Sequence, residues 1–257
     1  MKAMAEPKKI KRTQKRWAAV VLIITLVVAL SFYSSFYSTS SSEEDLTKAI
    51  EKYTGDSNVT LLETEKEENH LIALYTTEKP YYKGMVLFKR GWNGLWAPVE
   101  YNKATDISIT VLWGPFATHY RHIICGVNCD PRIVSYEYIC DYLDAVHYEY
   151  DETGKAFPVH SYGGNTSAYS GNVTESNFIH IYKDDKIGSH SADLKIYDSA
   201  GNNIEPELTE EMKENGIEKE SSMKITETGN IHFATWLILL VGFTAAWNLM
   251  IPRNKKK

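Results

Sequence analysis

The sequence lacks the motifs by which several large enzyme classes are recognised. Its 257 residues contain no G-x-S-x-G nucleophile elbow and no H-E-x-x-H zinc signature. They also contain no G-x-x-x-x-G-K-[ST] phosphate loop and no G-x-G-x-x-G dinucleotide fingerprint. These absences favour a non-enzymatic protein, and we expect no cofactor.

Cysteine is scarce, with only Cys125, Cys129 and Cys140. An odd number leaves at least one thiol outside any intramolecular disulfide. Two pairings are open, Cys125–Cys129 across a turn or Cys129–Cys140 across the following strand. The sequence shows no basic cluster that would lower the pKa of a thiol, so we expect no functional cysteine.

Charge is absent from two long runs, residues 17–42 and residues 233–251. A helix needs about 20 apolar residues to cross a bilayer. We therefore predict transmembrane helices over residues 17–37 and 232–251. For the first run a cleaved signal peptide is the open alternative, because a basic segment precedes a short apolar core.

Basic side chains gather at both ends of the chain. Residues 1–16 contain seven of them against one acidic residue, and residues 252–257 contain four. Basic residues beside a membrane span stay in the cytoplasm, so we expect cytoplasmic tails at residues 1–16 and 252–257. Residues 38–231 are then extracytoplasmic. Because the whole chain has a formal net charge of −5, this middle part is acidic, which argues against a nucleic-acid partner.

Residues 43–103 have the pattern of a small α+β domain. Ser42 is a good N-cap, acidic residues follow it, and apolar residues recur at helical spacing up to Tyr53. Four strand-like runs come next, and an Asn93-Gly94 pair between the last two is a strong hairpin signal. The sequence therefore predicts one helix packed on a four-stranded antiparallel meander.

Residues 104–204 have the pattern of an all-β domain. Short runs of β-branched and aromatic residues alternate with turns rich in Gly, Asp and Asn, which predicts a β-sandwich. Residues 205–231 are polar and acidic. Leu208, Met212 and Ile217 could give a short amphipathic helix, and otherwise we expect an acidic stalk that lifts the domains from the membrane. The predicted fold class is α+β, mainly β, with two flanking transmembrane helices.

The end of the all-β region, LKIYDSAGNNI at residues 194–204, is similar to the closing hairpin of immunoglobulin-like modules in bacterial surface proteins. The layout of residues 43–204 resembles membrane-anchored extracytoplasmic proteins of Gram-positive bacteria, in which a small α+β unit precedes an Ig-like β-sandwich. The antibody pattern Cys…Trp…Cys is absent, because Trp113 precedes Cys125. The resemblance therefore implies an architecture and no catalytic residues.

Four potential zinc ligands are close together in the sequence: His119, His122, Cys125 and Cys129. Zinc requires its ligands to converge on one point. The segment has the pattern of a strand, on which successive side chains alternate between faces. His119 and His122 would oppose each other, as would His122 and Cys125, so a metal site is not favoured.

The stretch His160–Asn177 is long for a loop and rich in Gly, Ser, Asn and Tyr. Long loops are often functional or mobile, and this composition is common in recognition loops. A ligand-binding loop and a disordered insertion are both open. The candidate ligand-binding residues are Tyr162, Asn165, Tyr169 and Asn172.

The favoured function is a two-pass membrane protein that presents an extracytoplasmic β-rich module to a protein or cell-envelope ligand. One alternative is an extracytoplasmic hydrolase whose site is assembled from scattered His, Asp and Glu side chains. Another is an accessory subunit of a membrane complex, in which Gly242 and Ala246 of the second span contact another helix. A tolerated pair of small residues is the simpler interpretation of these two positions.

Overall fold

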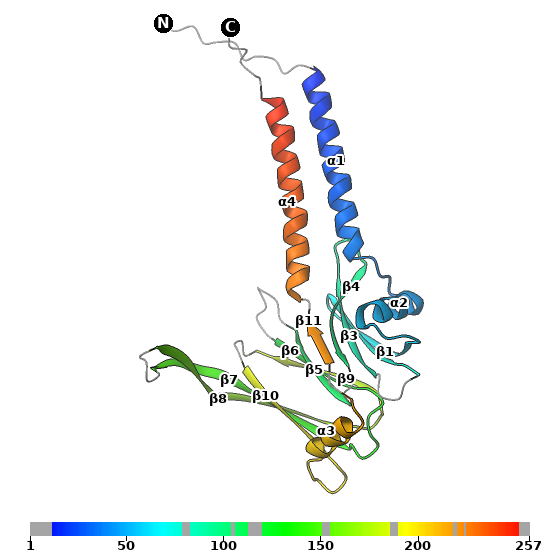
Figure 1. The fold of residues 1–257 in the computed structure, drawn as a ribbon, viewed down its shortest axis with the longest axis vertical. Helices are drawn as coiled ribbons and strands as arrows, with labels where there is room; N and C mark the ends of the chain where they lie inside the picture. The colour runs from blue at the N-terminus through cyan, green and yellow to red at the C-terminus, as the bar shows by residue number, and fades with distance from the viewer. Residues whose placement is uncertain are drawn as a thin grey trace.

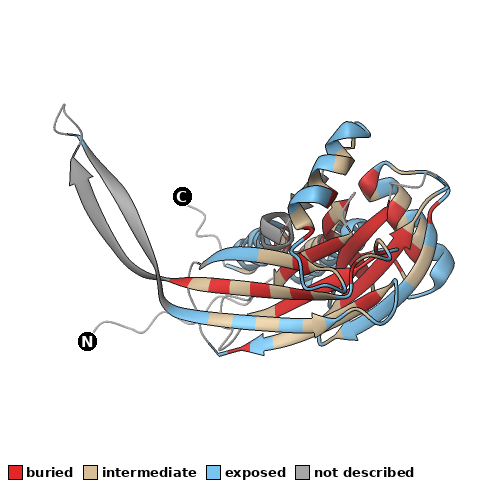
Figure 2. Ribbon diagram, turned by 90° about the horizontal axis from the view of Figure 1, so that it is seen from below, coloured by how far each residue is buried: buried red, intermediate tan, exposed pale blue. Residues whose placement is uncertain are grey.

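The fold is α+β: two long helices stand together on a body built from three antiparallel β-sheets (Figure 1). The buried residues are concentrated in the strands of this body (Figure 2). The computed structural model describes residues 12–78, 83–103, 106–112, 120–150, 155–185, 190–217, 220–223 and 225–251.

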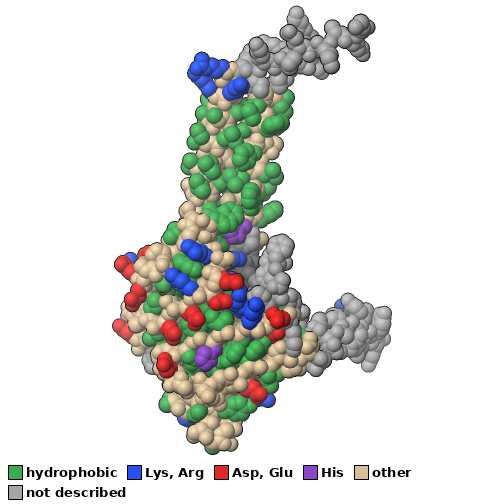
Figure 3. Space-filling view, turned by 180° about the vertical axis from the view of Figure 1, so that it is seen from behind, with side chains coloured by type: hydrophobic (Ala, Val, Ile, Leu, Met, Phe, Trp, Pro, Cys, Tyr) green, Lys and Arg blue, Asp and Glu red, His purple; other side chains and the backbone are tan. Residues whose placement is uncertain are grey.

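The two long helices are α1 (Arg12–Phe36) and α4 (Ile225–Met250), and they pack side by side. Each contains a segment long and apolar enough to cross a membrane. Their outward surface forms an apolar column with basic side chains at the end far from the body (Figure 3). The helices approach closely at Gly242, where a Cβ atom would lie 2.1 Å from the hydroxyl oxygen of Thr25.

The small residues of α4 therefore serve contacts within this chain. Gly242 contacts Thr25 of α1, and Ala246, one turn further along, is buried. Small residues let two helix backbones approach closely in a membrane. The small pair therefore does contact another helix, and that helix is α1 of the same chain.

Sheet A has the strand order β1-β2-β3-β4-β11. One face is covered by α2 (Glu43–Thr54), which buries Leu46 and Ile50 against it. This helix begins and ends where the sequence predicts. The hydroxyl of Ser42 accepts a hydrogen bond from the Asp45 N–H, and Gly55 ends the helix with a φ of 75°. The strands are β1 (Thr60–Glu67), β2 (His70–Thr76), β3 (Lys83–Arg90), β4 (Trp96–Lys103) and β11 (Glu220–Met223).

Sheet B, with the order β5-β6-β9, lies between sheet A and sheet C, with the order β10-β7-β8. On β6, Ile123 and Cys125 pack against sheet A, and Ile124 packs against sheet C. The segments predicted as two domains are therefore joined by a shared core. The strands are β5 (Ile107–Leu112), β6 (Tyr120–Gly126), β7 (Ser135–Tyr150), β8 (Ala156–Asn172), β9 (Phe178–Asp184) and β10 (His190–Tyr197).

Residues 205–231 do not form a stalk, and the alternative of a short amphipathic helix is what the structure shows at Glu205–Glu214. Helix α3 (Glu205–Glu214) buries Leu208 in the core of sheets B and C, at the end of the body far from the long helices (Figure 1). Strand β11 pairs with β4, and α4 already begins at Ile225. Two of the acidic residues of this segment serve packing, because Glu207 and Glu211 both form ion pairs with Arg132.

The prediction of a long loop at residues 160–177 is also wrong over most of its length. Residues up to Asn172 belong to β8, which pairs with β7 from Ser135↔Asn172 to Tyr150↔Ala156. The Gly- and Ser-rich composition has a packing reason at Gly171, where a Cβ atom would lie 2.6 Å from the Tyr136 hydroxyl oxygen. Cross-strand pairing thus outweighs the low strand propensity of these residues.

The three cysteines are buried and form no disulfide. Cys125 lies in the core between sheets A and B, whereas Cys129 and Cys140 lie in the core between sheets B and C. Burial raises the pKa of all three thiols, to about 12 for Cys129. Neither open pairing is formed, and a buried thiol of raised pKa is a poor nucleophile.

Candidate functional site

A polar network lies in the otherwise apolar layer between sheets B and C. At its centre, one carboxylate oxygen of Asp184 accepts hydrogen bonds from the hydroxyls of Tyr142 and Tyr169, each at 2.6 Å. The Nε2 atom of His122 lies 3.3 Å from the Tyr142 hydroxyl and 3.9 Å from that carboxylate oxygen. His122 is 0% exposed and Asp184 is 6% exposed.

The other side of the His122 ring also faces polar groups. Its Nδ1 atom lies 3.4 Å from the Tyr138 hydroxyl and 3.7 Å from the Cys140 sulfur. Burial raises the pKa of the Tyr138, Tyr142 and Tyr169 hydroxyls, and for the last two the hydrogen bond to Asp184 raises it further. These tyrosines therefore remain protonated, and Tyr142 and Tyr169 donate to Asp184.

A histidine, a carboxylate and tyrosine hydroxyls are the groups of a general acid–base site, but this arrangement is closed. Because the His122 side chain has no exposed surface, a substrate has no access to it in this fold. Asp141 lies at the surface, where it accepts a hydrogen bond from Thr166. His119 and the side chain of His147 lie outside the described residues. The network is therefore best understood as a means of joining the two sheets.

The candidate metal ligands do not come together. His122 belongs to the network between sheets B and C, and Cys125 points to the opposite side of β6. Cys129 follows the strand and donates to the carbonyl oxygen of Asp106 at 3.3 Å. Strand alternation causes this separation of His122 from Cys125. Among the residues that the structure describes, no three His, Cys, Asp or Glu side chains are grouped as metal ligands are.

The four candidate ligand-binding residues lie on β8 and have different surroundings. Asn165 and Asn172 are exposed, and Tyr169 is turned inward onto Asp184. The side chain of Tyr162 lies outside the described part of the structure. Asn165 and Asn172 can therefore contact a ligand at the surface, whereas Tyr169 is part of the buried polar network.

Strand β8 is the outer edge of sheet C, and none of its 17 residues is Asp, Glu, Lys or Arg. Proteins normally protect long sheet edges with charged side chains, because unpaired backbone groups recruit other strands. Three other described edge strands carry charged side chains away from the core: Glu63, Glu65, Lys66 and Glu67 in β1, Lys183 in β9, and Asp193 and Lys195 in β10. The edge strand β5 carries none, but it has only six residues against the 17 of β8.

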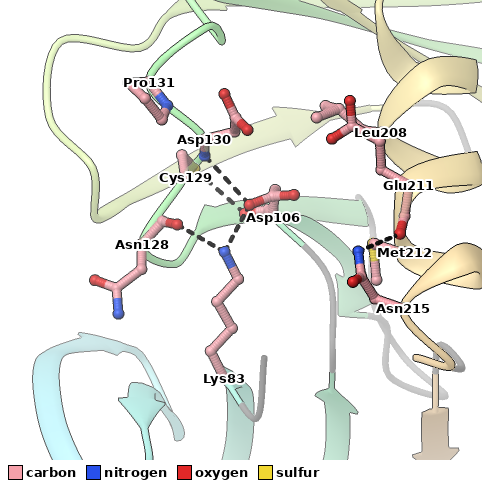
Figure 4. A pocket seen from close by; sticks show the side chains of 10 residues that line it. All are labelled: Lys83, Asp106, Asn128, Cys129, Asp130, Pro131, Leu208, Glu211, Met212 and Asn215. Atoms are coloured by element: carbon pink, nitrogen blue, oxygen red, sulfur yellow. Dashed lines mark hydrogen bonds and ion pairs between the residues drawn. The ribbon is translucent and has the colours of Figure 1, made fainter. Parts of the chain in front are cut away.

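A cavity of about 290 Å³ lies where β3, the loop after β6 and α3 meet (Figure 4). The Lys83 ammonium donates to the carboxylate of Asp106 and to the carbonyl of Asn128, both at 2.6 Å. The backbone N–H of Asp130 donates to the same carboxylate at 3.2 Å. Since the charges of Lys83 and Asp106 satisfy each other, we interpret this cavity as a junction of the three layers.

A cluster of aromatic side chains joins the body to the long helices. The backbone N–H of Trp92, in the turn between β3 and β4, donates to the Tyr33 hydroxyl at 2.8 Å, and the two rings stack. The Tyr37 hydroxyl lies 3.3 Å from Nε2 of His232. Trp92 and Trp236, whose rings meet edge to face, are 62% and 61% exposed. We call these five residues the aromatic junction.

Comparisons with models of protein families, with curated proteins and with solved structures found no match to this chain. Its function is therefore inferred from geometry.

Proposed function

We propose that this chain is a two-pass membrane protein that holds an extracytoplasmic, immunoglobulin-like β module against the membrane and uses it to bind a protein or cell-envelope ligand. The observation that carries this proposal is the aromatic junction at the base of two exposed apolar helices. Tryptophan and tyrosine are enriched at membrane–water interfaces. Because Tyr33 and Tyr37 of α1 contact the body, we favour a retained anchor over a cleaved signal peptide.

The strand order supports the immunoglobulin-like part of the proposal. In such sandwiches strands A, B and E share one sheet, and strands C and F share the other, which C′ can extend. The orders β5-β6-β9 and β10-β7-β8 correspond to A-B-E and F-C-C′. A bridge between Tyr197 and Asn203 stands where the closing F–G hairpin begins, as the resemblance of residues 194–204 implies.

The orientation is testable with added cysteines, because the three native thiols are buried and unreactive. Ala200→Cys places a thiol on an exposed turn of the body, and Thr13→Cys places one at the exposed start of α1. A membrane-impermeant maleimide is expected to label the Ala200→Cys variant in intact cells and the Thr13→Cys variant only after permeabilisation. Labelling in the opposite pattern would show that the proposed topology is wrong.

The edge of β8 is the surface that we propose for the ligand. An exposed edge binds an extended peptide as an additional strand through main-chain hydrogen bonds. The side chains of Asn165, Ala168 and Ser170 are exposed, and none of them is charged. The proposed ligand is therefore a protein that offers an extended segment.

Ala168→Lys is expected to weaken this binding, because lysine on an edge strand opposes strand addition. With a photocrosslinking amino acid at Asn165, we expect a discrete adduct in intact cells, reduced roughly fivefold or more by Ala168→Lys, which corresponds to a loss of about 1 kcal/mol. Ala192→Lys on the exposed edge strand β10 is the matched control and is expected to leave the adduct unchanged. An adduct that is insensitive to Ala168→Lys would disprove strand addition at β8.

A further inference from the structure

A second cavity lies on the side of the body that faces the long helices. It has a volume of about 490 Å³ and is formed by the last turn of α1, by α2, by β4 and by the beginning of α4. Figure 1 shows α2 beside the lower end of α1. Pockets for small ligands are typically about 300–1,000 Å³, so this cavity is large enough for a lipid headgroup.

The cavity lies at the level where both apolar segments reach the body. Phe36 is the last residue of α1, and Ile231 is the second residue of the apolar segment Asn230–Met250. The exposed rings of Trp92 and Trp236 lie at the same end of the helices. In a membrane this level is the headgroup region, where aromatic side chains are favoured.

The two sides of the cavity differ in chemistry. Lys48 and Lys52 are one helical turn apart on α2 and line it together, and both are exposed. Phe36, Pro98 and Ile231 form an apolar wall. Basic side chains are visible next to the base of the apolar column in Figure 3.

Acidic groups near the two lysines are already engaged. Asp45 also lines the cavity, and its carboxylate accepts a hydrogen bond from the Ser40 hydroxyl. Lys48 pairs with Glu44, in an exposed ion pair of the kind that contributes little and exchanges readily. Asp45 keeps its charge, so the two lysines and this carboxylate give the cavity lining a net charge of +1 beside an apolar wall.

We infer that this cavity binds the headgroup of an anionic phospholipid of the extracytoplasmic leaflet. Lys48 and Lys52 contact the phosphate, since a lysine ammonium binds phosphate as a point charge. The wall of Phe36, Pro98 and Ile231 contacts the glycerol and the upper acyl chains. This inference rests on the proposed membrane placement of α1 and α4.

The experiment uses the full-length protein in nanodiscs of phosphatidylcholine, with and without phosphatidylglycerol. Native mass spectrometry after release counts the lipids that remain bound. We expect the wild-type protein to retain phosphatidylglycerol in preference to phosphatidylcholine by roughly thirtyfold, because each lysine contributes about 1 kcal/mol toward a lipid with a net negative charge. Phosphatidylcholine has the same phosphate, but its choline cation cancels the charge. The double variant Lys48→Gln/Lys52→Gln is expected to lose this preference.

Lys195→Gln/Lys213→Gln is the matched control, because it removes the same charge from sites that do not line the cavity. It is expected to keep the preference. Equal retention of both lipids by the wild-type protein, or an unchanged preference in Lys48→Gln/Lys52→Gln, would overturn the inference. Tighter binding of glycerol 3-phosphate than of phosphatidylglycerol would do so too, because it would show that the apolar wall contributes nothing and would assign the cavity to a soluble phosphoester.

Failure of the lipid experiment is distinguishable from failure of the proposed function. The labelling of Ala200→Cys and Thr13→Cys in cells reports topology whether or not the cavity binds lipid. Correct topology without a phosphatidylglycerol preference removes only the lipid site. Since both lysines are exposed, their replacement by glutamine is expected to leave the melting temperature of the detergent-solubilised protein unchanged.

Discussion

Asp184→Ala is expected to lower the free energy of unfolding by about 2–6 kcal/mol, because it leaves two buried hydroxyl donors without an acceptor. The substitution removes the acceptor that the hydroxyls of Tyr142 and Tyr169 share. His122 beside them is fully buried, so water cannot replace the lost carboxylate there. Each buried donor left without an acceptor costs about 1–3 kcal/mol. The measurement is chemical or thermal unfolding of the detergent-solubilised protein, followed by tyrosine and tryptophan fluorescence.

The neighbouring residue supplies a matched control for this prediction. Asp185 is exposed, so Asp185→Ala is expected to change the free energy of unfolding by no more than about 0.5 kcal/mol. Tyr142→Phe and Tyr169→Phe each remove one donor and are expected to cost about 1–2 kcal/mol. If Asp184→Ala is as mild as Asp185→Ala, the network does not join sheets B and C.

Gly242→Ala is expected to destabilise the helix pair by about 1–3 kcal/mol, the usual cost of inserting a methyl group into a packed contact. The added Cβ would lie 2.1 Å from the Thr25 hydroxyl oxygen and 2.2 Å from its Cγ2 atom, so α1 and α4 must move apart. The measurement is the apparent melting temperature in detergent.

A second substitution, at Thr25, tests whether a steric clash with this side chain causes the loss of stability. Thr25→Gly removes the atoms that the new methyl group meets, so the double variant Thr25→Gly/Gly242→Ala is expected to recover most of the lost stability. Ala245→Val enlarges an exposed residue of the same helix and is expected to have little effect. Absence of rescue by Thr25→Gly would show that the two helices do not meet at Gly242.

The elements that the sequence predicts correctly are those with local signals. The α2 helix follows from the Ser42 cap, the apolar spacing and Gly55. The Asn93-Gly94 pair correctly predicts a turn between β3 and β4. There the Gly94 N–H donates to the Gly91 carbonyl, and Gly94 has a positive φ of 78°. The two apolar helices follow from length and the absence of charge.

The elements that the sequence misses depend on partners far away in the chain. Strand β8 has a loop-like composition and becomes a strand because β7 pairs with it. The acidic composition of α3 suggests a solvent-exposed stalk, but two of its acidic residues, Glu207 and Glu211, form ion pairs with Arg132 of the body. In the sequence, Leu208, Met212 and Ile217 permit a short amphipathic helix, but their spacing does not tell which sheets Leu208 packs against.

The sequence by itself determined that this protein has two uncharged apolar segments, a basic group at each end and a β-rich middle. Each of these properties depends on a segment of about 20 residues, so the length of an apolar run and the position of charged residues are enough to predict it. Only the tertiary structure decided that His122 and Asp184 meet between two sheets and that β8 is an unprotected edge. It also decided that Lys48 and Lys52 share a cavity with Ile231. These contacts join residues about 60 to 180 positions apart, and local patterns do not encode which distant residues will pack together.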